Sequence, residues 1–181
     1  MLRRAVRHAE RSLIVLEIEP RSTPKTIVDR AVELKKQANR DAKRSADDNL
    51  RYDEIWCAFD VHDHLLIAEA QEQAKANGVE LAISNPCFEL WALLHFQDQH
   101  AHIDRGKVQR LCAKHMPGYE KELSYDILRS KYSDALRRAE DLEKWHDSRG
   151  TPGENPSTMV YKLVERIRAQ TGPHTVSVLR G

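Results

Sequence analysis

Three short apolar runs, separated by two amphipathic stretches, constrain the fold of this chain more than any other feature. The runs are "SLIVLEIE" at residues 12–19, "DEIWCAFD" at residues 53–60 and "VELAIS" at residues 79–84. Their aliphatic and aromatic side chains favour buried strands. The first stretch between them predicts a helix of about five turns, with Ser22 or Thr23 as its N-cap. The second predicts a helix over residues 65–78 that ends at Gly78. This alternation predicts an α/β fold with a parallel sheet.

The second half of the chain predicts helices. Residues 85–96, "NPCFELWALLHF", are apolar nearly all round, which is typical of a buried helix with Asn85 as its N-cap. Asp104 would cap another helix, and two more are expected over about residues 125–146 and 157–170. We therefore expect one domain over residues 1–181, with an α/β core at residues 12–96 and a helical part at residues 104–172.

Composition narrows the class of protein only a little. The 181 residues include 29 basic and 28 acidic side chains, so the net charge of +1 argues neither for nor against a nucleic-acid partner. No apolar run approaches the roughly 18 residues of a membrane span. The three cysteines are far apart in the sequence, which predicts neither a disulfide framework nor a thiolate zinc site. These features predict a cytoplasmic protein without a membrane partner.

Polar residues follow the second and third apolar runs directly. Asp60 ends the second run, and Ser84 and Asn85 end the third. Open parallel sheets bind ligands outside the carboxyl ends of their strands, so we expect these residues to share one crevice. Asp60, His62 and Asp63 are candidate metal ligands there: carboxylates suit Mg²⁺ or Mn²⁺, and an imidazole shifts the preference towards Mn²⁺, iron or zinc. The alternative is a solvated loop in which Asp63 caps the next helix.

The helix expected over residues 85–96 contains two further candidates. Glu89 would lie near its start, either as a site carboxylate or as a stabiliser of the helix dipole. His95, two turns further on, is either a catalytic residue or a core side chain that hydrogen-bonds internally. The free N–H groups at the helix start can also receive a phosphate, near Ser84 and Asn85. Lys121 is a candidate phosphate contact, with a solvated lysine as the alternative.

Several of these segments together resemble the RloB-like family over about residues 19–168. The most specific is "SNPCFELWALLHF", and "RYDEIWCAFDVHDH", "PGYEK" and "ENPSTMVYKLVERI" follow the family pattern in the same order. The resemblance implies a three-layer Toprim-like fold and metal-dependent cleavage of DNA or RNA phosphodiesters, with Mg²⁺ or Mn²⁺ as cofactor. It also implies a restriction or phage-defence setting, with an ATPase encoded nearby as a partner. Asp60 would be the first acidic metal ligand, and Asp60, Glu89 and His95 are the candidate catalytic residues.

The sequence departs from the family pattern in two places. The family's general acid or base, a glutamate, ends an earlier strand in an "EGxTE"-like stretch, which is absent here. Residues 13–26 resemble the family's second strand and following helix, so we expect the first strand to be truncated. His62 stands where the Asp-x-Asp pattern has a carboxylate. The alternative function is therefore a catalytically degenerate module that binds nucleic acid or an ATPase.

Overall fold

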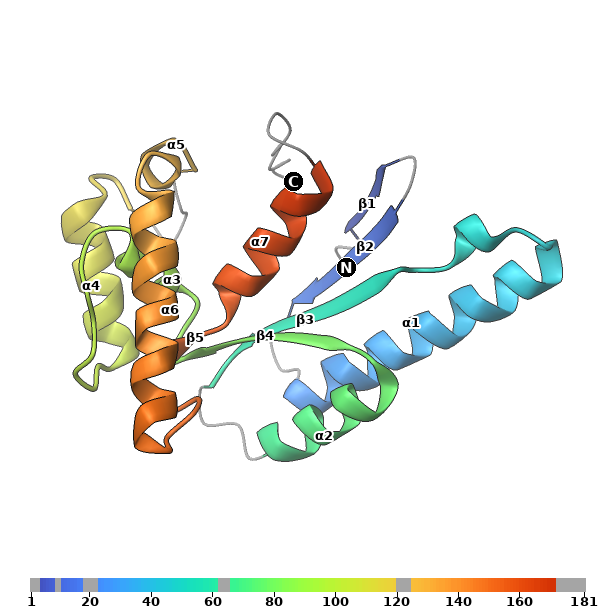
Figure 1. The fold of residues 1–181 in the computed structure, drawn as a ribbon, viewed down its shortest axis with the longest axis horizontal. Coiled ribbons are helices and arrows are strands. Elements are labelled where there is room, and N and C mark those ends of the chain that lie inside the picture. The colour runs from blue at the N-terminus through green and yellow to red at the C-terminus, as the bar shows by residue number, and fades with distance from the viewer. Residues whose placement is uncertain (1–3, 9–10, 18–22, 62–65, 120–124, 172–181) are drawn as a thin grey trace. The chain divides into compact units, whose positions relative to one another are not determined.

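The computed structural model describes residues 4–8, 11–17, 23–61, 66–119 and 125–171 (Figure 1). The strands are β1 (Arg4–His8), β2 (Arg11–Glu17), β3 (Glu54–Asp60), β4 (Glu80–Asn85) and β5 (Ser157–Thr158). The helices are α1 (Pro24–Ser45), the 3₁₀ helix η1 (Asp48–Leu50), α2 (Ile67–Asn77), α3 (Glu89–Leu94), α4 (Arg105–His115), α5 (Tyr125–Arg129), α6 (Tyr132–Arg149) and α7 (Val160–Thr171). The expected α/β class is confirmed. None of the described helices is both long and apolar enough to cross a membrane.

The sheet is mixed, which corrects the expectation of a parallel one. Its strand order is β1-β2-β3-β4-β5. Strands β2 and β3 are parallel, and Figure 1 shows β3 and β4 running in the same direction, but β1–β2 and β4–β5 are antiparallel. Only residues 9 and 10 separate β1 from β2, and so short a link joins antiparallel strands only. The sequence of β1, "RAVRH", contains no carboxylate, so this strand does not supply the family's glutamate.

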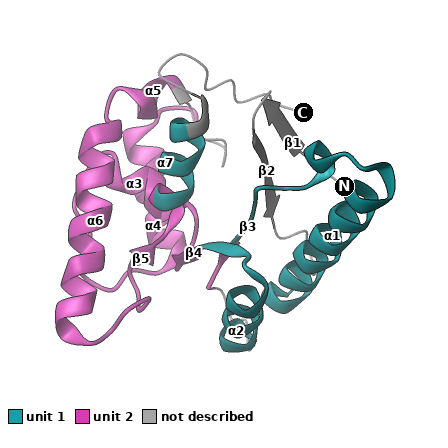
Figure 2. Cartoon of the chain, turned by 45° about the vertical axis from the view of Figure 1, so that its right-hand side comes forward, with its two compact units in different colours: residues 1–58, 64–82, 162–181 teal, residues 59–63, 83–161 magenta. Residues whose placement is uncertain are grey.

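The chain divides into two compact units (Figure 2). Unit 1 comprises residues 1–58, 64–82 and 162–181, and unit 2 comprises residues 59–63 and 83–161. This division differs from the expected one between residues 12–96 and 104–172. The helix that follows β4 packs with the later helices, because its apolar surface is covered by α4 and α6.

Helices cover both faces of the sheet in unit 1, as the three-layer expectation requires. Trp56 and Ala58 of β3 pack in one apolar cluster with Leu163 of α7. The thiol of Cys57, between them, donates to the carbonyl oxygen of Ile27 in α1 at 3.8 Å. Successive side chains of a strand point to opposite faces, so α7 lies on one face and α1 on the other. Figure 1 shows the same arrangement.

The ends of α1 and α2 follow local rules that the sequence predicts. Thr23 is the N-cap of α1, and its Oγ1 accepts from the backbone N–H of Thr26 at 3.2 Å. Gly78 ends α2 in the left-handed conformation, with φ of 60°. Lys35 of α1 donates to the carbonyl oxygens of Asn77 and Gly78 at 2.8 and 2.7 Å. A lysine there satisfies carbonyls that a helix end leaves free, and it fastens α1 to α2.

Two helix predictions in unit 2 were wrong in their boundaries. Helix α3 begins at Glu89, and Asn85 is the last residue of β4 rather than an N-cap. Pairing of Asn85 with Ser157 of β5 keeps the backbone extended at this point. The helix expected over residues 125–146 is two helices, α5 and α6, separated by Ser130 and Lys131. The Ser130 hydroxyl donates to the carbonyl oxygen of Ile127 at 3.2 Å, a local bond that competes with continued helix.

Helix α3 forms the centre of unit 2. It contacts α4, α6 and β5, and each of its residues after Glu89 is buried. The adjoining core cluster consists of Cys87, Ala92, Leu93, Ile103, Val108, Cys112, Met116 and Leu128. A helix that is apolar on every side is stable only when other elements surround it, which is the situation predicted for this segment.

Candidate active site

The carboxyl ends of β3 and β4 lie side by side, as expected from the sequence. The backbone N–H of Val61, the residue after Asp60, donates to the carbonyl oxygen of Ser84 at 2.8 Å. This bond brings the end of one strand against the end of the other, although Val61 and Ser84 are 23 positions apart in the chain. The two polar segments predicted to share a crevice therefore adjoin within unit 2.

Asp60 lies at this edge beside a basic residue that the sequence reasoning did not identify. Its carboxylate forms an ion pair with the guanidinium of Arg105, the first residue of α4. Burial raises the pKa of Asp60, and the negative charge of Glu89 raises it further. Arg105 and the backbone N–H of Phe88 act in the opposite direction, but the net shift is upward. Asp60 is thus a partly buried carboxylate with a second carboxylate near it.

Glu89 is held by hydrogen bonds from two other segments of unit 2. Its Oε1 accepts from Nε2 of Gln109 at 2.9 Å and from the hydroxyl of Tyr119 at 3.4 Å. Burial acts to raise the pKa of Glu89, but hydrogen bonds from its own backbone N–H, Gln109 and Cys87, with the charge of Arg105, outweigh burial and lower it. Glu89 is therefore ionised at neutral pH and fixed in orientation.

Helix α4 supplies the partners of both carboxylates. Arg105 and Gln109 are four residues apart, so they lie one turn apart on the same face of the helix. Arg105 binds Asp60, and Gln109 binds Glu89. The helix start is fixed by Asp104, whose Oδ1 accepts from the backbone N–H of Lys107 at 2.8 Å, as predicted for an N-cap. One face of α4 thus aligns the two acidic side chains.

Two buried thiols border Glu89. The thiol of Cys87 bonds to the Glu89 carboxylate, and that of Cys112 donates to the Glu89 carbonyl oxygen at 3.5 Å. Burial and the charge of Glu89 raise the pKa of Cys112 to about 12 and that of Cys87 as well. Both sulfurs therefore stay protonated at neutral pH, and a protonated thiol is neither a nucleophile nor a metal ligand.

Ser84 and Asn85, the predicted phosphate contacts, are engaged in holding a neighbouring segment. The Ser84 side chain is 1% exposed, and its Oγ lies 2.8 Å from Oγ1 of Thr158 in β5. Asn85 donates from Nδ2 to the carbonyl oxygen of Gly153 at 3.1 Å. These bonds favour a structural role. They also hold the "ENPST" segment in place, and this segment contributes the edge strand β5 beside the candidate site.

The same segment is fastened by Asn155 and His146. Asn155 both donates to the carbonyl oxygen and accepts from the backbone N–H of Ile103, each at 2.9 Å. His146 of α6 bonds through Nε2 to the carbonyl oxygen of Pro156 at 2.8 Å and through Nδ1 to Oγ1 of Thr151 at 3.0 Å. Ile103 precedes Asp104 and Arg105 directly, so Asn155 also fixes the start of α4.

His95, a candidate catalytic residue, is a core side chain. It is 3% exposed, its Nδ1 lies 2.9 Å from the carbonyl oxygen of Trp91, and its ring packs edge-on against the Trp91 indole. Burial lowers the pKa of His95. These contacts match the alternative in which His95 hydrogen-bonds within the core.

The remaining candidates, His62, Asp63 and Lys121, lie outside the described residues. Helix α2 has Leu66 at its N-cap position. Within the described ranges, no group of three or more His, Cys, Asp or Glu side chains is placed to hold a metal. Asp60 and Glu89 offer two carboxylates, and Mg²⁺ is commonly bound through one or two carboxylates together with water and substrate phosphates. Their donor chemistry fits a hard divalent cation.

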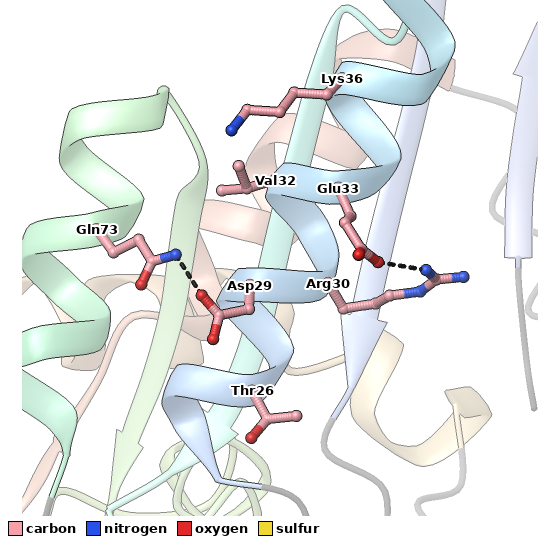
Figure 3. Close-up of a pocket in the computed structure, with 7 residues that line it drawn as sticks. All are labelled: Thr26, Asp29, Arg30, Val32, Glu33, Lys36 and Gln73. Atoms are coloured by element: carbon pink, nitrogen blue, oxygen red, sulfur yellow. Dashed lines mark hydrogen bonds and ion pairs between the residues drawn. The ribbon is translucent and has the colours of Figure 1, made fainter.

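A separate groove in unit 1 contains several charged side chains but little spare binding capacity. Thr26, Asp29, Arg30, Val32, Glu33 and Lys36 of α1 and Gln73 of α2 line it (Figure 3). Asp29 accepts from Gln73 and from Lys25, and Arg30 pairs with Glu33 at 2.7 Å. Both carboxylates of the groove are thus bonded to side chains of α1 or α2.

Sequence reasoning missed Arg105, Gln109 and Tyr119. The four-residue spacing after the Asp104 cap could have indicated that Arg105 and Gln109 share a face, but not which residues they would meet. Tyr119 belongs to the "PGYEK" segment, whose hydroxyl contact with Glu89 links it to "SNPCFELW". That contact joins two segments of the chain that resemble the family pattern.

Comparison with known proteins supports one assignment. The family model described as RloB-like protein matches residues 2–167. No curated protein and no solved structure matches the chain. Because the match extends over most of the sequence, the chain belongs to the RloB-like family.

Proposed function

We propose that this chain is the nuclease component of a bacterial restriction or phage-defence system, and that it cleaves DNA or RNA phosphodiesters with the aid of Mg²⁺ or Mn²⁺. The observation on which the proposal depends is the meeting of Asp60, Glu89 and Arg105 at adjoining strand ends. The family's association with an ATPase makes such an enzyme the proposed partner. Carboxylates can hold the divalent cation of a phosphodiester-cleaving site, and a guanidinium can bind the phosphate.

Asp60 would be the principal ligand of the cation. Its raised pKa reflects a carboxylate whose charge is incompletely compensated where it is buried. A divalent cation would supply that compensation, so binding of the cation and ionisation of Asp60 would favour each other. When bound, the metal would polarise a phosphate oxygen and activate water.

Glu89 and Arg105 would orient the substrate around that ligand. Glu89 is ionised and fixed by Gln109 and Tyr119, so it can serve as a second ligand or hold a water molecule without reorganising. Arg105 pairs with Asp60 and is about one third exposed, which leaves donors for a phosphate. A phosphate oxygen that reaches Arg105 is also close to Asp60.

A catalytically degenerate nucleic-acid-binding module, or ATPase partner, is the second candidate. The ion pair supports this candidate, because Arg105 already compensates part of the Asp60 charge that a cation would otherwise compensate. The histidine at position 62, where the family pattern has a carboxylate, also favours the degenerate module. The two candidates share the phosphate-binding part of the site and differ in whether the bond is broken.

A cleavage assay on the purified full chain separates them. End-labelled single-stranded DNA, duplex DNA, single-stranded RNA and tRNA would be incubated with Mn²⁺, with Mg²⁺ and with EDTA. We expect metal-dependent cleavage of at least one substrate, and a loss of at least about 100-fold for Asp60→Asn, since even outer-shell changes cost about 10- to 100-fold at metal sites. Asp141→Asn, an exposed acid on α6, is the matched control.

Two outcomes of the cleavage assay would contradict the nuclease proposal. Cleavage by Asp60→Asn at the rate of the wild type would reject the proposed site, since the activity would then come from elsewhere. Binding without cleavage, with every substrate and either metal, would favour the degenerate module.

A further inference from the structure

Phe88 is an exposed aromatic residue in a segment that is otherwise buried. It is 40% exposed, and it is the only large apolar side chain classed as exposed in the described part of the chain. Its neighbours Cys87 and Leu90 are both fully buried. A single exposed aromatic is common on protein surfaces and has no meaning by itself. Phe88 is a candidate for ligand contact because it lies beside Asp60 and Glu89.

Phe88 adjoins the candidate active site through its backbone. Its backbone N–H is hydrogen-bonded to the carboxylate of Asp60. The next residue is Glu89, whose carboxylate is the other acidic group of the site. The exposed ring therefore belongs to a residue whose backbone bonds Asp60 and whose neighbour in the chain is Glu89.

Arg105, at the same place, has hydrogen-bonding capacity to spare. A guanidinium has five N–H donors, and its described hydrogen bond goes to Asp60 alone. Its Nε is buried and has no hydrogen-bond partner among the described residues. An unsatisfied buried donor has a cost of its own, so a ligand that lets the guanidinium turn and bond fully would be favoured.

From these contacts we infer that Phe88 and Arg105 form a subsite for one unpaired nucleotide, with the base stacked on the Phe88 ring and the adjacent phosphate bound by Arg105. The inference rests on the proposed function for the site and adds its substrate class, which is single-stranded or locally unpaired nucleic acid. Aromatic rings stack on bases of any sequence, and arginine pairs with phosphate through parallel N–H bonds.

The duplex is the disfavoured form for a physical reason. Within a double helix each base is stacked between its neighbours, so neither face is free for an external ring. A loop, a single strand or an extruded nucleotide presents that face without the cost of unstacking. The subsite would thus select for structure rather than for sequence.

The test is binding in EDTA, which separates recognition from cleavage. Fluorescence anisotropy would measure the Kd of labelled 15-nucleotide dT and U strands, a dT strand with consecutive abasic positions, and a 15-base-pair duplex. Phe88→Leu keeps an apolar side chain of similar size but removes the aromatic face. Because base–aromatic stacking is worth about 1–3 kcal/mol, we expect binding of the dT or U strand to weaken by about 5- to 100-fold.

Three controls distinguish stacking from a structural effect. Phe88→Tyr should bind like the wild type. Tyr52→Leu, a change to an aromatic residue in unit 1, should leave the Kd unchanged. The abasic strand should bind Phe88→Leu and the wild type equally, because it has no base to lose. A separate variant tests the phosphate contact: Arg105→Gln should reduce the salt dependence of log Kd by about one phosphate contact.

Equal binding of the dT and U strands by Phe88→Leu and the wild type would overturn the inference, as would a duplex bound as tightly as the single strands. These results are independent of the cleavage assay. If Asp60→Asn loses metal-dependent cleavage while Phe88→Leu binds as the wild type does, the subsite is refuted and the nuclease function is supported. If Phe88→Leu binds more weakly and neither the wild type nor any variant cleaves, the nuclease function is refuted and the subsite is supported.

Discussion

Substitution of Asn155 tests whether the "ENPST" segment is fastened as described. The Asn155 amide makes two hydrogen bonds to the backbone of Ile103, one as donor and one as acceptor, each 2.9 Å long. Ile103 is 1% exposed, so its backbone groups have little access to water. Asn155→Ala removes both bonds and leaves two backbone groups without partners.

The expected cost follows from these two bonds. A typical hydrogen bond contributes about 1 kcal/mol, and a buried group left unsatisfied costs about 1–3 kcal/mol. We therefore expect Asn155→Ala to lower the free energy of unfolding by about 2–4 kcal/mol. Asn155→Asp should be equally harmful at neutral pH, because an oxygen would face the Ile103 carbonyl. Part of that loss should be recovered on acidification, when the introduced carboxyl group gains a proton to donate.

Urea unfolding followed by tryptophan fluorescence measures the effect. With an m-value of about 2 kcal/mol/M, the midpoint for Asn155→Ala should fall by about 1–2 M. Asn49→Ala is the matched control, because the Asn49 side chain is exposed and its loss should change stability by no more than about 0.5 kcal/mol. A midpoint for Asn155→Ala that coincides with the control would refute the proposed role of the segment.

Three further predictions concern buried groups and one turn. Burial lowers the pKa of His95 below its ordinary 6.5, so its contribution to stability is complete above pH 6.5 and is lost as pH falls through the lower, folded-state value. The urea midpoint of the wild type should therefore fall between pH 7 and pH 5. His95→Gln should reduce this pH dependence of the midpoint, whereas His100→Gln, at an exposed histidine, should not. The three cysteines are all buried, so native protein at pH 8 should not react with Ellman's reagent, and guanidinium should release three thiols; fast native labelling would contradict the described core. Gly78→Ala should cost about 1–2 kcal/mol in thermal unfolding, since its φ is 60° and a Cβ would lie 3.0 Å from Nζ of Lys35; an unchanged Tm would be the adverse result.

The sequence predicts those features of the fold that depend on neighbouring residues. The apolar runs that became β2, β3 and β4 were recognisable because short, continuous apolar runs between turns are typical of strands. The caps at Thr23, Gly78 and Asp104 were recognisable because each satisfies helix ends within a few residues. The adjacency of Asp60 and Ser84 followed from strand order alone.

The features that were missed depend on contacts between distant residues. Asn-Pro is typical of a helix start, yet Asn85 stays in β4 because it pairs with Ser157, 72 residues later. Strand β5 has only two residues, too few for any pattern to be visible. Arg105 is one of many basic residues in the sequence, and only the packing of α4 against α3 brings it to Asp60. Local patterns do not contain this information.

The most direct test of the account is Mn²⁺ binding measured by electron paramagnetic resonance, without any nucleic acid. Asp60 and Glu89 should belong to one cation site, so both Asp60→Asn and Glu89→Gln should weaken Mn²⁺ binding by at least about 10-fold, whereas Asp141→Asn should not. Equal Mn²⁺ affinity in the wild type, Asp60→Asn and Glu89→Gln would contradict the claim that these two carboxylates form a metal site.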